Sequence, residues 1–397
     1  MIRYRVLAQA VSLFAGSMAC AQIDAEAWQT NATFATNPAG APYIRVPLGL
    51  IPATLYADGS RVQTENEQVW RYVCGSHGET TTDALARDVQ IAKTSLAESA
   101  GVPTTTRGSG GLDIVFNPNG SVPAAAVAAL ADVEAYIESQ FDNETTMTID
   151  VSFASMNPNV IGVTGNIFVQ TPWMDARPAL RASMDFDDEI QDFLPTGAVP
   201  VRYSPNGSVS NELRVFFSRG NYRAVVGSIS GSVAQITLNS QYNFDYNPAN
   251  GVPGSATSFI DVMVHEVGHM LGFVSGVDDR VNDIDVLDLF RFRRGSDPNN
   301  PSTLAEFTTT PRLAVFDAPG TDQSNSDIIT DEYRMSDGNP YQASHFREVS
   351  IGSPIGIMDP ALAGGETFYP NYYQTADLKM FDAIGYIYPP CDHPSIN

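Results

Sequence analysis

The chain has few basic residues and no long apolar segment beyond its N-terminus. Its 397 residues include 22 Lys and Arg against 45 Asp and Glu. A surface this acidic repels nucleic acid and anionic lipid, so neither is expected as a partner. No segment after the first 21 residues is apolar over a length that could cross a bilayer, which excludes a membrane span. This balance favours a soluble secreted protein whose copies repel one another by like charge.

Residues 1–21 have the pattern of a secretory signal peptide. The cationic start MIRYR precedes the apolar run VLAQAVSLFAGSMA, which is too short to span a bilayer. Ala19, Cys20 and Ala21 form a small-residue cleavage signal, so the mature chain is expected to start near Gln22. We therefore expect secretion, to the extracellular space or to the periplasm of a Gram-negative host. Lipid anchoring at Cys20 is less favoured, because Ser17 stands where a large aliphatic residue is usual.

The sequence pattern changes near residue 110. Residues 22–109 are poorly periodic and end in a Gly/Thr/Pro-rich linker, GVPTTTRGSGG at 101–111. We interpret 22–109 as an N-terminal region and a candidate pro-segment, with Arg107 as an exposed cut site. Residues 110–390 then form the main domain, and 391–397 a short tail.

Hydrophobic periodicity between residues 110 and 390 predicts an α+β fold. Strands are expected at LDIVFN (112–117), at residues 147–153, at NELRVFFS (211–218) and at VAQITLNS (233–240). A helix should open at Ser121 and Pro123, and a short one should run from Thr375 to Gly385. The apolar face expected for the first helix comprises Val127, Leu130, Val133, Ile137 and Phe141.

The chain has only five histidines, and two of them lie four residues apart in DVMVHEVGHMLGFVSGVDD (261–279). On a helix, His265 and His269 project from the same face, with Glu266 beside them. This H-E-x-x-H arrangement is typical of zinc hydrolases, in which zinc acidifies a bound water and the carboxylate takes its proton. A metal-free core helix is disfavoured, because buried His and Glu side chains would lack partners. Gly268 would also weaken such a helix by roughly 1 kcal/mol relative to alanine.

The stretch HEVGHMLGF is similar to the H-E-x-x-H-x-x-G opening of the metzincin endopeptidases. Gly272 can adopt a left-handed conformation and end the helix there. The next ligand of short metzincins is His or Asp, and here that position is Ser275, so the short form is excluded. Downstream, YQASHFREVSIGSPIGIMDP contains His345 and then Met358, which resembles the Met-turn of the family, and TADLKMFDAIGY is similar to its terminal helix.

This order resembles the leishmanolysin-type branch, and also a group of uncharacterised secreted bacterial metalloproteases that share FVSGVD and DLFRF (273–278 and 288–292). The resemblance covers roughly residues 112–388. It implies a zincin-like domain with a twisted mixed sheet, an active-site helix and a C-terminal helix after the Met-turn. It further implies one catalytic Zn²⁺ held by His265, His269 and His345, with Glu266 as the general base. The expected function is a secreted zinc metalloendopeptidase acting on proteins or peptides.

Two other functions remain open at this stage. In a gluzincin-type peptidase the third ligand would be an acid about twenty residues after the second histidine, and Asp288 is placed for that role. A non-catalytic binding or surface protein on a zincin fold is the second alternative, which the intact Glu266 disfavours. If the chain is a peptidase, VAQITLNS is expected to be an edge strand that pairs with extended substrate.

Two further groups have competing interpretations. Cys74 and Cys391 remain after signal removal, and in an oxidising compartment they favour one disulfide. The alternative is a Cys74 thiolate that occupies the open position of the zinc from a pro-segment.

A cluster of aspartates follows the histidine helix. It could bind Ca²⁺, but it lacks the spacing and glycine of an EF-hand, so a solvated face is favoured. That cluster comprises Asp278, Asp279, Asp283, Asp285 and Asp288.

Overall fold

The structure is a computed structural model that describes most of residues 111–388 and three earlier strands. The gaps in 111–388 are 185–187, 189, 205–206, 278–283, 294–300, 315–325, 329–332, 337–340 and 348–353. The earlier strands are β1 (Thr33–Thr36), β2 (Pro42–Arg45) and β3 (Gln68–Ser76). Several predictions concern residues outside the described ones: the signal peptide with Cys20, the linker with Arg107, the acidic residues Asp278, Asp279 and Asp283, and the tail with Cys391.

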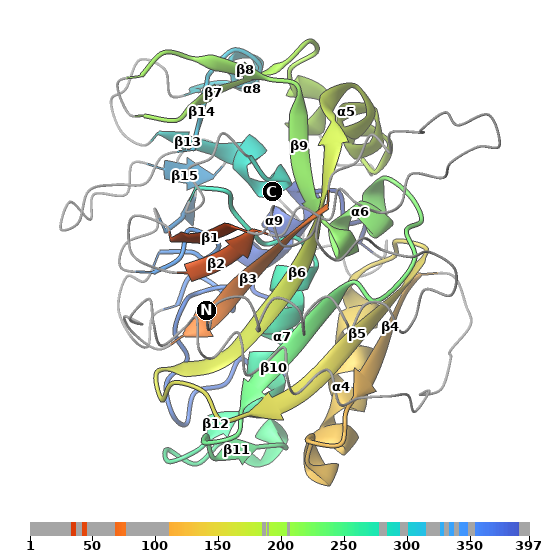
Figure 1. The fold of residues 1–397 in the computed structure, drawn as a ribbon, viewed down its shortest axis with the longest axis vertical. Helices are drawn as coiled ribbons and strands as arrows, with labels where there is room; N and C mark the ends of the chain where they lie inside the picture. The colour runs from red at the N-terminus through yellow and green to blue at the C-terminus, as the bar shows by residue number, and fades with distance from the viewer. Residues whose placement is uncertain are drawn as a thin grey trace, which may run out of the picture.

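A twisted mixed sheet forms the centre of the fold (Figure 1). Its strand order is β3–β6–β10–β5–β4, and β9 also pairs with β6. Strands β4, β5 and β10 are parallel, whereas β6 runs antiparallel to β10, β3 and β9. The strands other than β3 are β4 (Leu112–Pro118), β5 (Thr145–Ala154), β6 (Val160–Pro172), β9 (Arg214–Ser218) and β10 (Ala234–Asn239). The mixed α+β class predicted from the sequence is confirmed.

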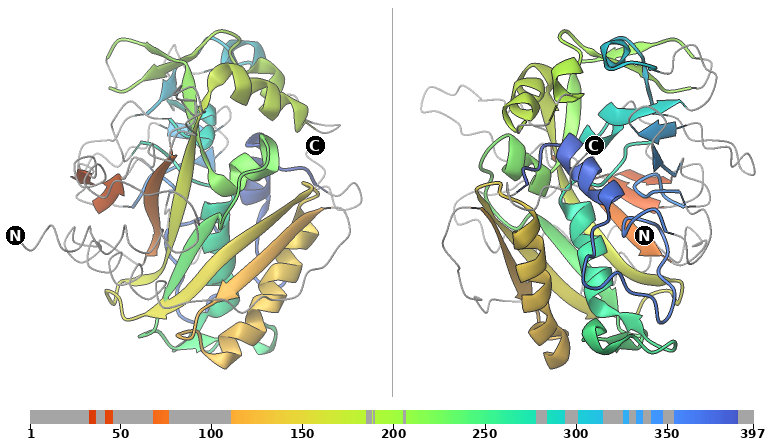
Figure 2. Two further views of the ribbon diagram at one scale, coloured as in Figure 1. Left: turned by 45° about the vertical axis from the view of Figure 1, so that its right-hand side comes forward. Right: turned by 180° about the vertical axis from the view of Figure 1, so that it is seen from behind.

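Two helices cover one face of this sheet, as the view from behind in Figure 2 shows. Helix α4 (Ala124–Gln140) packs on β4, and helix α7 (Phe259–Met270) packs on β6 and against α4. The apolar stripe predicted for α4 is buried at Leu130, Val133 and Ile137, but Val127 is 40% exposed and was wrongly assigned to the core. The sheet and helices thus enclose one apolar core.

Helix α7 is buried along its whole length, so its ends are fixed by chemistry inside the protein. At its start the Ser258 hydroxyl accepts a hydrogen bond from the backbone N–H of Asp261. At its end Gly272 has φ +113°, its N–H donates to His269 O, and Phe273 N–H donates to Gly268 O. This is a Schellman motif, and it confirms the stop predicted at Gly272.

The chain after α7 forms shorter elements and returns to the core through helix α9 (Thr375–Ala383). The predicted stop at Gly385 is confirmed, with φ +100°. The remaining short helices are α5 (Trp173–Ala182), α6 (Arg219–Val225), α8 (Leu304–Phe307), η1 (Ile190–Phe193), η2 (Pro248–Asn250) and η3 (Val286–Phe290). The remaining short strands are β7 (Val199–Arg202), β8 (Ser210–Glu212), β11 (Phe244–Asp245), β12 (Thr257–Ser258), β13 (Arg291–Arg293), β14 (Arg312–Leu313), β15 (Ser326–Ile328) and β16 (Tyr333–Arg334).

Two strand predictions need correction. The segment 233–240 was expected at an edge, but β10 is central, because β5 binds one side of it and β6 the other. The segment 211–218 was expected as one strand, but it divides into β8, which pairs with β7, and β9, which pairs with β6. Both errors arise from pairing with strands distant in sequence, which local periodicity does not report. Among the described helices none is long and apolar enough to cross a membrane, as expected.

Gly268 is expected to reverse the usual effect of a helical glycine-to-alanine change. A Cβ at this position would lie 2.4 Å from the Met358 sulfur and 3.4 Å from the Phe381 ring. Gly268→Ala should therefore cost about 1–3 kcal/mol of unfolding free energy instead of adding roughly 1 kcal/mol. Urea unfolding of the metal-free protein measures this. Gly120→Ala, where no atom lies within 4 Å of the added carbon, is the matched control, and a stabilised Gly268→Ala would contradict the packing described.

Candidate metal centre

Helix α7 presents two histidines from one face. His265 and His269 are four residues apart, and their Nε2 atoms lie 3.0 Å from each other. Their rings are almost perpendicular, with an interplanar angle of 88°. Both side chains are buried, so the two nitrogens meet inside the protein and not in bulk water.

The third histidine comes from the segment 341–347, far along the chain. The Nε2 of His345 lies 3.2 Å from that of His269. The backbone around it is held on both sides, since Ser336 N–H donates to His345 O and Phe346 N–H donates to Met358 O. Among the described residues these three histidines are the group that could hold a metal ion, with ligand atoms all within 4.8 Å.

In each of the three rings, the hydrogen-bond partner of Nδ1 determines whether Nε2 carries a proton or a lone pair. The Nδ1 atoms of His265 and His269 lie 2.7 and 2.8 Å from the carbonyl oxygens of Ile357 and Phe273. The Nδ1 of His345 is 3.3 Å from the carbonyl oxygen of Gln342. A carbonyl oxygen only accepts, so the proton of each neutral ring must be on Nδ1, and each Nε2 carries a lone pair.

Three lone pairs that point at one another fit a cation and not a hydrogen-bonded cluster. Ligand nitrogens bound to one tetrahedral ion at about 2.0–2.1 Å lie roughly 3.3 Å apart. The separations of 3.0 and 3.2 Å are close to that value, and the third pair lies within 4.8 Å. The donor set is therefore suited to a divalent metal ion that accepts nitrogen ligands.

Burial keeps these rings neutral. It lowers the pKa of His265 to about 4, since the charged imidazolium would lose its hydration. Burial also lowers the pKa of His269 and of His345 well below the usual range, and the neighbouring rings add to this. Neutral imidazole is the form that binds metal, so no proton has to leave near neutral pH.

Glu266 lies next to this group and is held by the neighbouring strand. The Oγ1 of Thr164 in β6 lies 2.5 Å from Glu266 Oε2 and 2.9 Å from its backbone oxygen. A Cβ on Gly162, also in β6, would lie 2.7 Å from Glu266 Oε1. Glu266 and His265 both line a cleft that continues along Ile357 and Leu362. The carboxylate thus has a fixed place at the wall of the cleft, and its side chain is fully buried.

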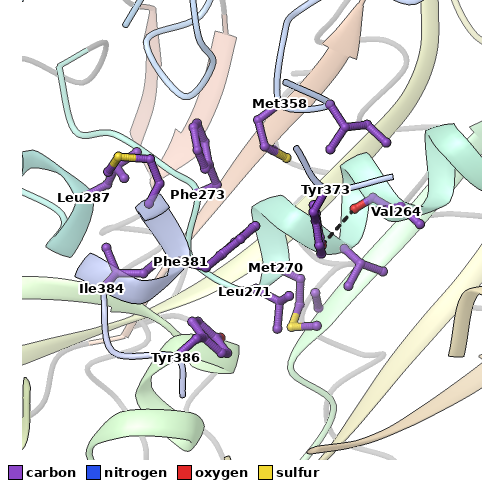
Figure 3. Close-up of a cluster of buried hydrophobic side chains, with 14 of the residues drawn as sticks. Val264, Met270, Leu271, Phe273, Leu287, Met358, Tyr373, Phe381, Ile384 and Tyr386 are labelled. Atoms are coloured by element: carbon purple, nitrogen blue, oxygen red, sulfur yellow. Dashed lines mark hydrogen bonds between the residues drawn. The ribbon is translucent and has the colours of Figure 1, made fainter. Parts of the chain in front are cut away.

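A turn around Met358 packs against helix α7 (Figure 3). Its Ile357 carbonyl orients His265, and the Met358 side chain fits into the space left by Gly268. The turn is fixed from α9, because the Asp377 carboxylate accepts from Ile357 N–H at 2.9 Å and from Met358 N–H at 3.1 Å. The Met358 side chain therefore packs against α7. The carbonyl oxygen of the preceding residue, Ile357, orients His265, which is a candidate metal ligand.

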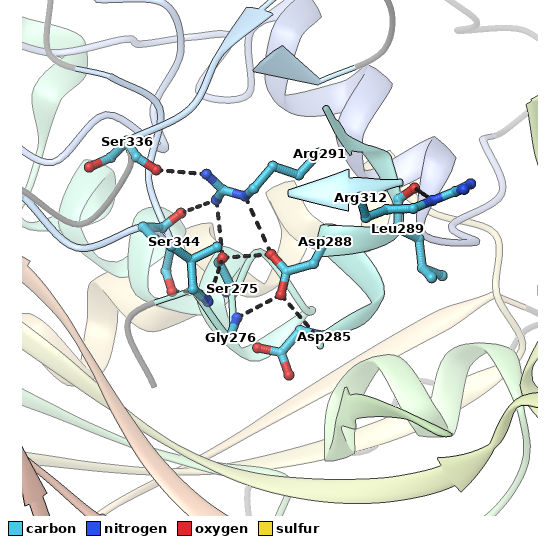
Figure 4. A network of polar contacts seen from close by, with 11 residues as sticks. Ser275, Gly276, Asp285, Asp288, Leu289, Arg291, Arg312, Ser336 and Ser344 are labelled. Carbon is cyan, nitrogen blue, oxygen red and sulfur yellow. Dashed lines mark hydrogen bonds and ion pairs between the residues drawn. The ribbon is translucent and has the colours of Figure 1, made fainter. Parts of the chain in front are cut away.

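Asp288 lies in a separate polar group (Figure 4). Its carboxylate accepts from the Ser275 hydroxyl, from Gly276 N–H and from Asp285 N–H at 2.6–2.9 Å. It is not part of the three-histidine group. Asp285 and Asp288 are both buried, so the solvated acidic face expected from the sequence was wrong for these two residues. Their partners are backbone N–H groups and remote side chains, which composition does not reveal.

Sequence reasoning missed Thr164, Gly162 and Asp377. The first two come from β6, whose contact with α7 is long-range. Asp377 had a local signal, since it is the third residue of α9 and forms a capping box with Gln374. Its second function, accepting hydrogen bonds from the Met358 turn, has no sequence signature. Comparison of the chain with protein-family models, curated proteins and solved structures finds no match.

Asp377 should give the Met358 turn a measurable pH dependence. Burial raises the pKa of Asp377 from 3.8 to about 6, against the backbone hydrogen bonds that lower it. The folded chain then binds the proton more tightly than the unfolded chain, so this stabilisation is present below pH 4 and lost as the pH rises through 6. The Asp377→Asn variant lacks this titration. In urea unfolding of the metal-free proteins, wild type should exceed the variant by more at pH 4 than at pH 7. Equal differences at both pH values would contradict this assignment.

Proposed function

We propose that the protein is a secreted zinc-dependent endopeptidase that hydrolyses proteins or peptides. The observation that carries this proposal is the convergence of three buried imidazole Nε2 atoms beside a carboxylate that lines a cleft. The sequence resemblance to metzincins supports it independently, through the helix stop at Gly272 and the turn at Met358. Secretion rests on the signal-peptide pattern at residues 1–21.

Zinc is favoured over other metals by the ligand chemistry. Three neutral imidazoles without a carboxylate suit Zn²⁺, and they leave its fourth position for a reacting group. When bound, zinc supplies a Lewis acid that polarises a carbonyl group and makes water a nucleophile near neutral pH. Calcium prefers oxygen ligands, so this site does not support a Ca²⁺ proposal.

Glu266 is the residue that moves the proton. One carboxylate oxygen accepts a proton from the attacking water and delivers it to the leaving amine as the peptide bond breaks. The Thr164 hydroxyl at 2.5 Å holds the other oxygen, so the carboxylate keeps one orientation through both transfers. His265, His269 and His345 remain neutral ligands, each oriented by a backbone carbonyl.

The cleft beside Glu266 has one apolar part, which suits an apolar side chain. Ile161, Val262, Leu362 and Phe368 form this part, and Asp261 and Asp359 also line the cleft together with His265 and Glu266. A peptide with an apolar residue next to the scissile bond would place that side chain here and bring its carbonyl group close to the histidines. Burial of such a side chain contributes on the order of 1.5–3 kcal/mol to binding.

Strand β3 of the N-terminal region lies where extended substrate would be expected. It pairs antiparallel along β6, with Cys74 opposite Val163 and Gly75 opposite Gly162. Gly162 is the residue whose Cβ position meets Glu266, so β3 covers the sheet beside the proposed base. An extended peptide that bound β6 by strand addition would compete with β3 for the same backbone groups. This supports the interpretation of residues 22–109 as a pro-segment.

Asp288 as third ligand is not supported, because its carboxylate already accepts three hydrogen bonds away from the histidines. A non-catalytic binding protein would need no oriented carboxylate beside the metal. Turnover by the purified protein separates that alternative from the peptidase.

Glu266→Gln should retain one zinc per chain and lose at least about 100-fold in kcat on a quenched peptide, since the amide cannot accept the proton. The exposed Glu144→Gln is the matched control and should retain wild-type activity. Zinc content is measured by atomic absorption beside the kinetic assay. A Glu266→Gln variant with the wild-type rate would refute the mechanism.

Removal of β3 should activate the enzyme. A recognition site for a specific protease, introduced within residues 101–110 of a Cys391→Ser variant, allows the N-terminal region to be released after folding, since no disulfide to Cys74 can then retain it. Cleavage there should raise kcat/KM on peptides at least about tenfold, because β6 becomes free to bind substrate. The same variant left uncut is the control. Unchanged activity after complete release would exclude an inhibitory role for this region.

A further inference from the structure

A buried polar network connects the end of α7 with the segment that carries His345 (Figure 4). Its central residues are Ser275, Asp288 and Arg291, and all three are buried. The Ser275 hydroxyl donates to Asp288 Oδ1 at 2.6 Å and accepts from Arg291 Nη2 at 3.1 Å. Arg291 Nε lies 3.4 Å from the same Asp288 oxygen, so the ion pair has no net charge.

The guanidinium of Arg291 binds the backbone on both sides of the loop before His345. Its Nη1 donates to Ser336 O at 2.8 Å, and its Nη2 donates to Ala343 O at 2.7 Å. The backbone N–H of Ser336 in turn donates to His345 O at 2.9 Å. Arg291 therefore holds Ala343, which lies two positions before His345, and Ser336, whose backbone N–H donates to His345 O.

Ser275 adds a second connection to the same segment. Its backbone N–H donates to the Ser344 hydroxyl at 3.0 Å, next to His345. Ser275 comes three residues after Gly272, where the chain has just left α7. The network thus extends from the helix that carries two histidines to the segment that carries the third.

We propose that Arg291, with Asp288 and Ser275, is the positioning unit that places His345 at the metal centre. The inference rests on the metal site of the proposed function but not on peptidase activity. A planar guanidinium can hold two carbonyls in fixed directions, which the flexible ammonium of lysine does not. Without this unit His345 would lose its place, and the site would retain the two histidines of α7.

Zinc affinity, measured by competition with a chromophoric chelator, tests this role. Arg291→Met should weaken binding by about 10-fold, the lower end of the about 10- to 100-fold effect of losing a ligand's direct hydrogen-bond partner, because Arg291 acts on the backbone beside His345 and not on its ring. The absorption spectrum of the Co²⁺-substituted variant should shift toward that of His345→Ala. Arg223→Met is the control, since Arg223 also donates to backbone carbonyls, those of Thr146, Ile229 and Gly231, but lies outside the segment between His269 and His345. It should keep wild-type affinity and spectrum.

The double variant separates positioning from general destabilisation. If Arg291 acts through His345, Arg291→Met should cause no further loss of zinc affinity in a His345→Ala background. The same factor of loss in both backgrounds would overturn the proposal, as would unchanged affinity in the single variant. Ser275→Ala, which removes one hydroxyl and no charge, repeats the test in a milder form and should weaken zinc binding a few-fold. Wild-type protein that binds zinc but cleaves no peptide would contradict the peptidase alone.

Discussion

The structure depends on one electrostatic constraint, the meeting of three imidazole lone pairs in the interior. Backbone carbonyls at Ile357, Phe273 and Gln342 face the outer ring nitrogens, so the inner nitrogens cannot donate to one another. Buried acceptors without a donor are costly, and Glu266 beside them adds a carboxylate. A cation resolves both problems at once, because it accepts the nitrogen lone pairs and offsets the negative charge. The rest of the domain can be understood as the framework that holds these groups together.

Two glycines make that framework possible, one on each side of α7. Gly162 lets β6 approach Glu266, and Gly268 lets Met358 pack against the helix. A side chain at either place would push apart elements that orient the site. The strand therefore positions the Glu266 carboxylate, and the turn positions the His265 ring. Stability and chemistry use the same contacts here, because every residue of the helix that carries the site is buried.

The sequence could predict those parts of the site whose structure is determined by residues close together in the chain. Helix α7 and its stop at Gly272 follow from residue spacing and from a glycine that adopts positive φ. His345 was reached only through a resemblance, because no local pattern connects it with His269. The central position of β10 was missed for the same reason, because it depends on pairing with the distant strand β6. The burial of Asp288 was missed for another reason, because its partners Ser275, Gly276, Asp285 and Arg291 are near in sequence but are brought together by a loop conformation that residue spacing does not report.

The distance between His269 and His345 explains why a buried network is needed at all. Closing a long loop costs entropy that grows slowly with length, but the residues near its end must still be ordered. The insertion supplies this order with its own small core, in which Arg312 stacks on Phe292 and Phe307, and with the network around Arg291. A third ligand at position 275, only six residues after His269, would have needed neither this small core nor the network around Arg291. Here that position holds a serine whose hydrogen bonds help to fix the distant histidine. A metal ion held by the three histidines would therefore be thermodynamically linked to the folding of the insertion, since each would stabilise the conformation that the other requires.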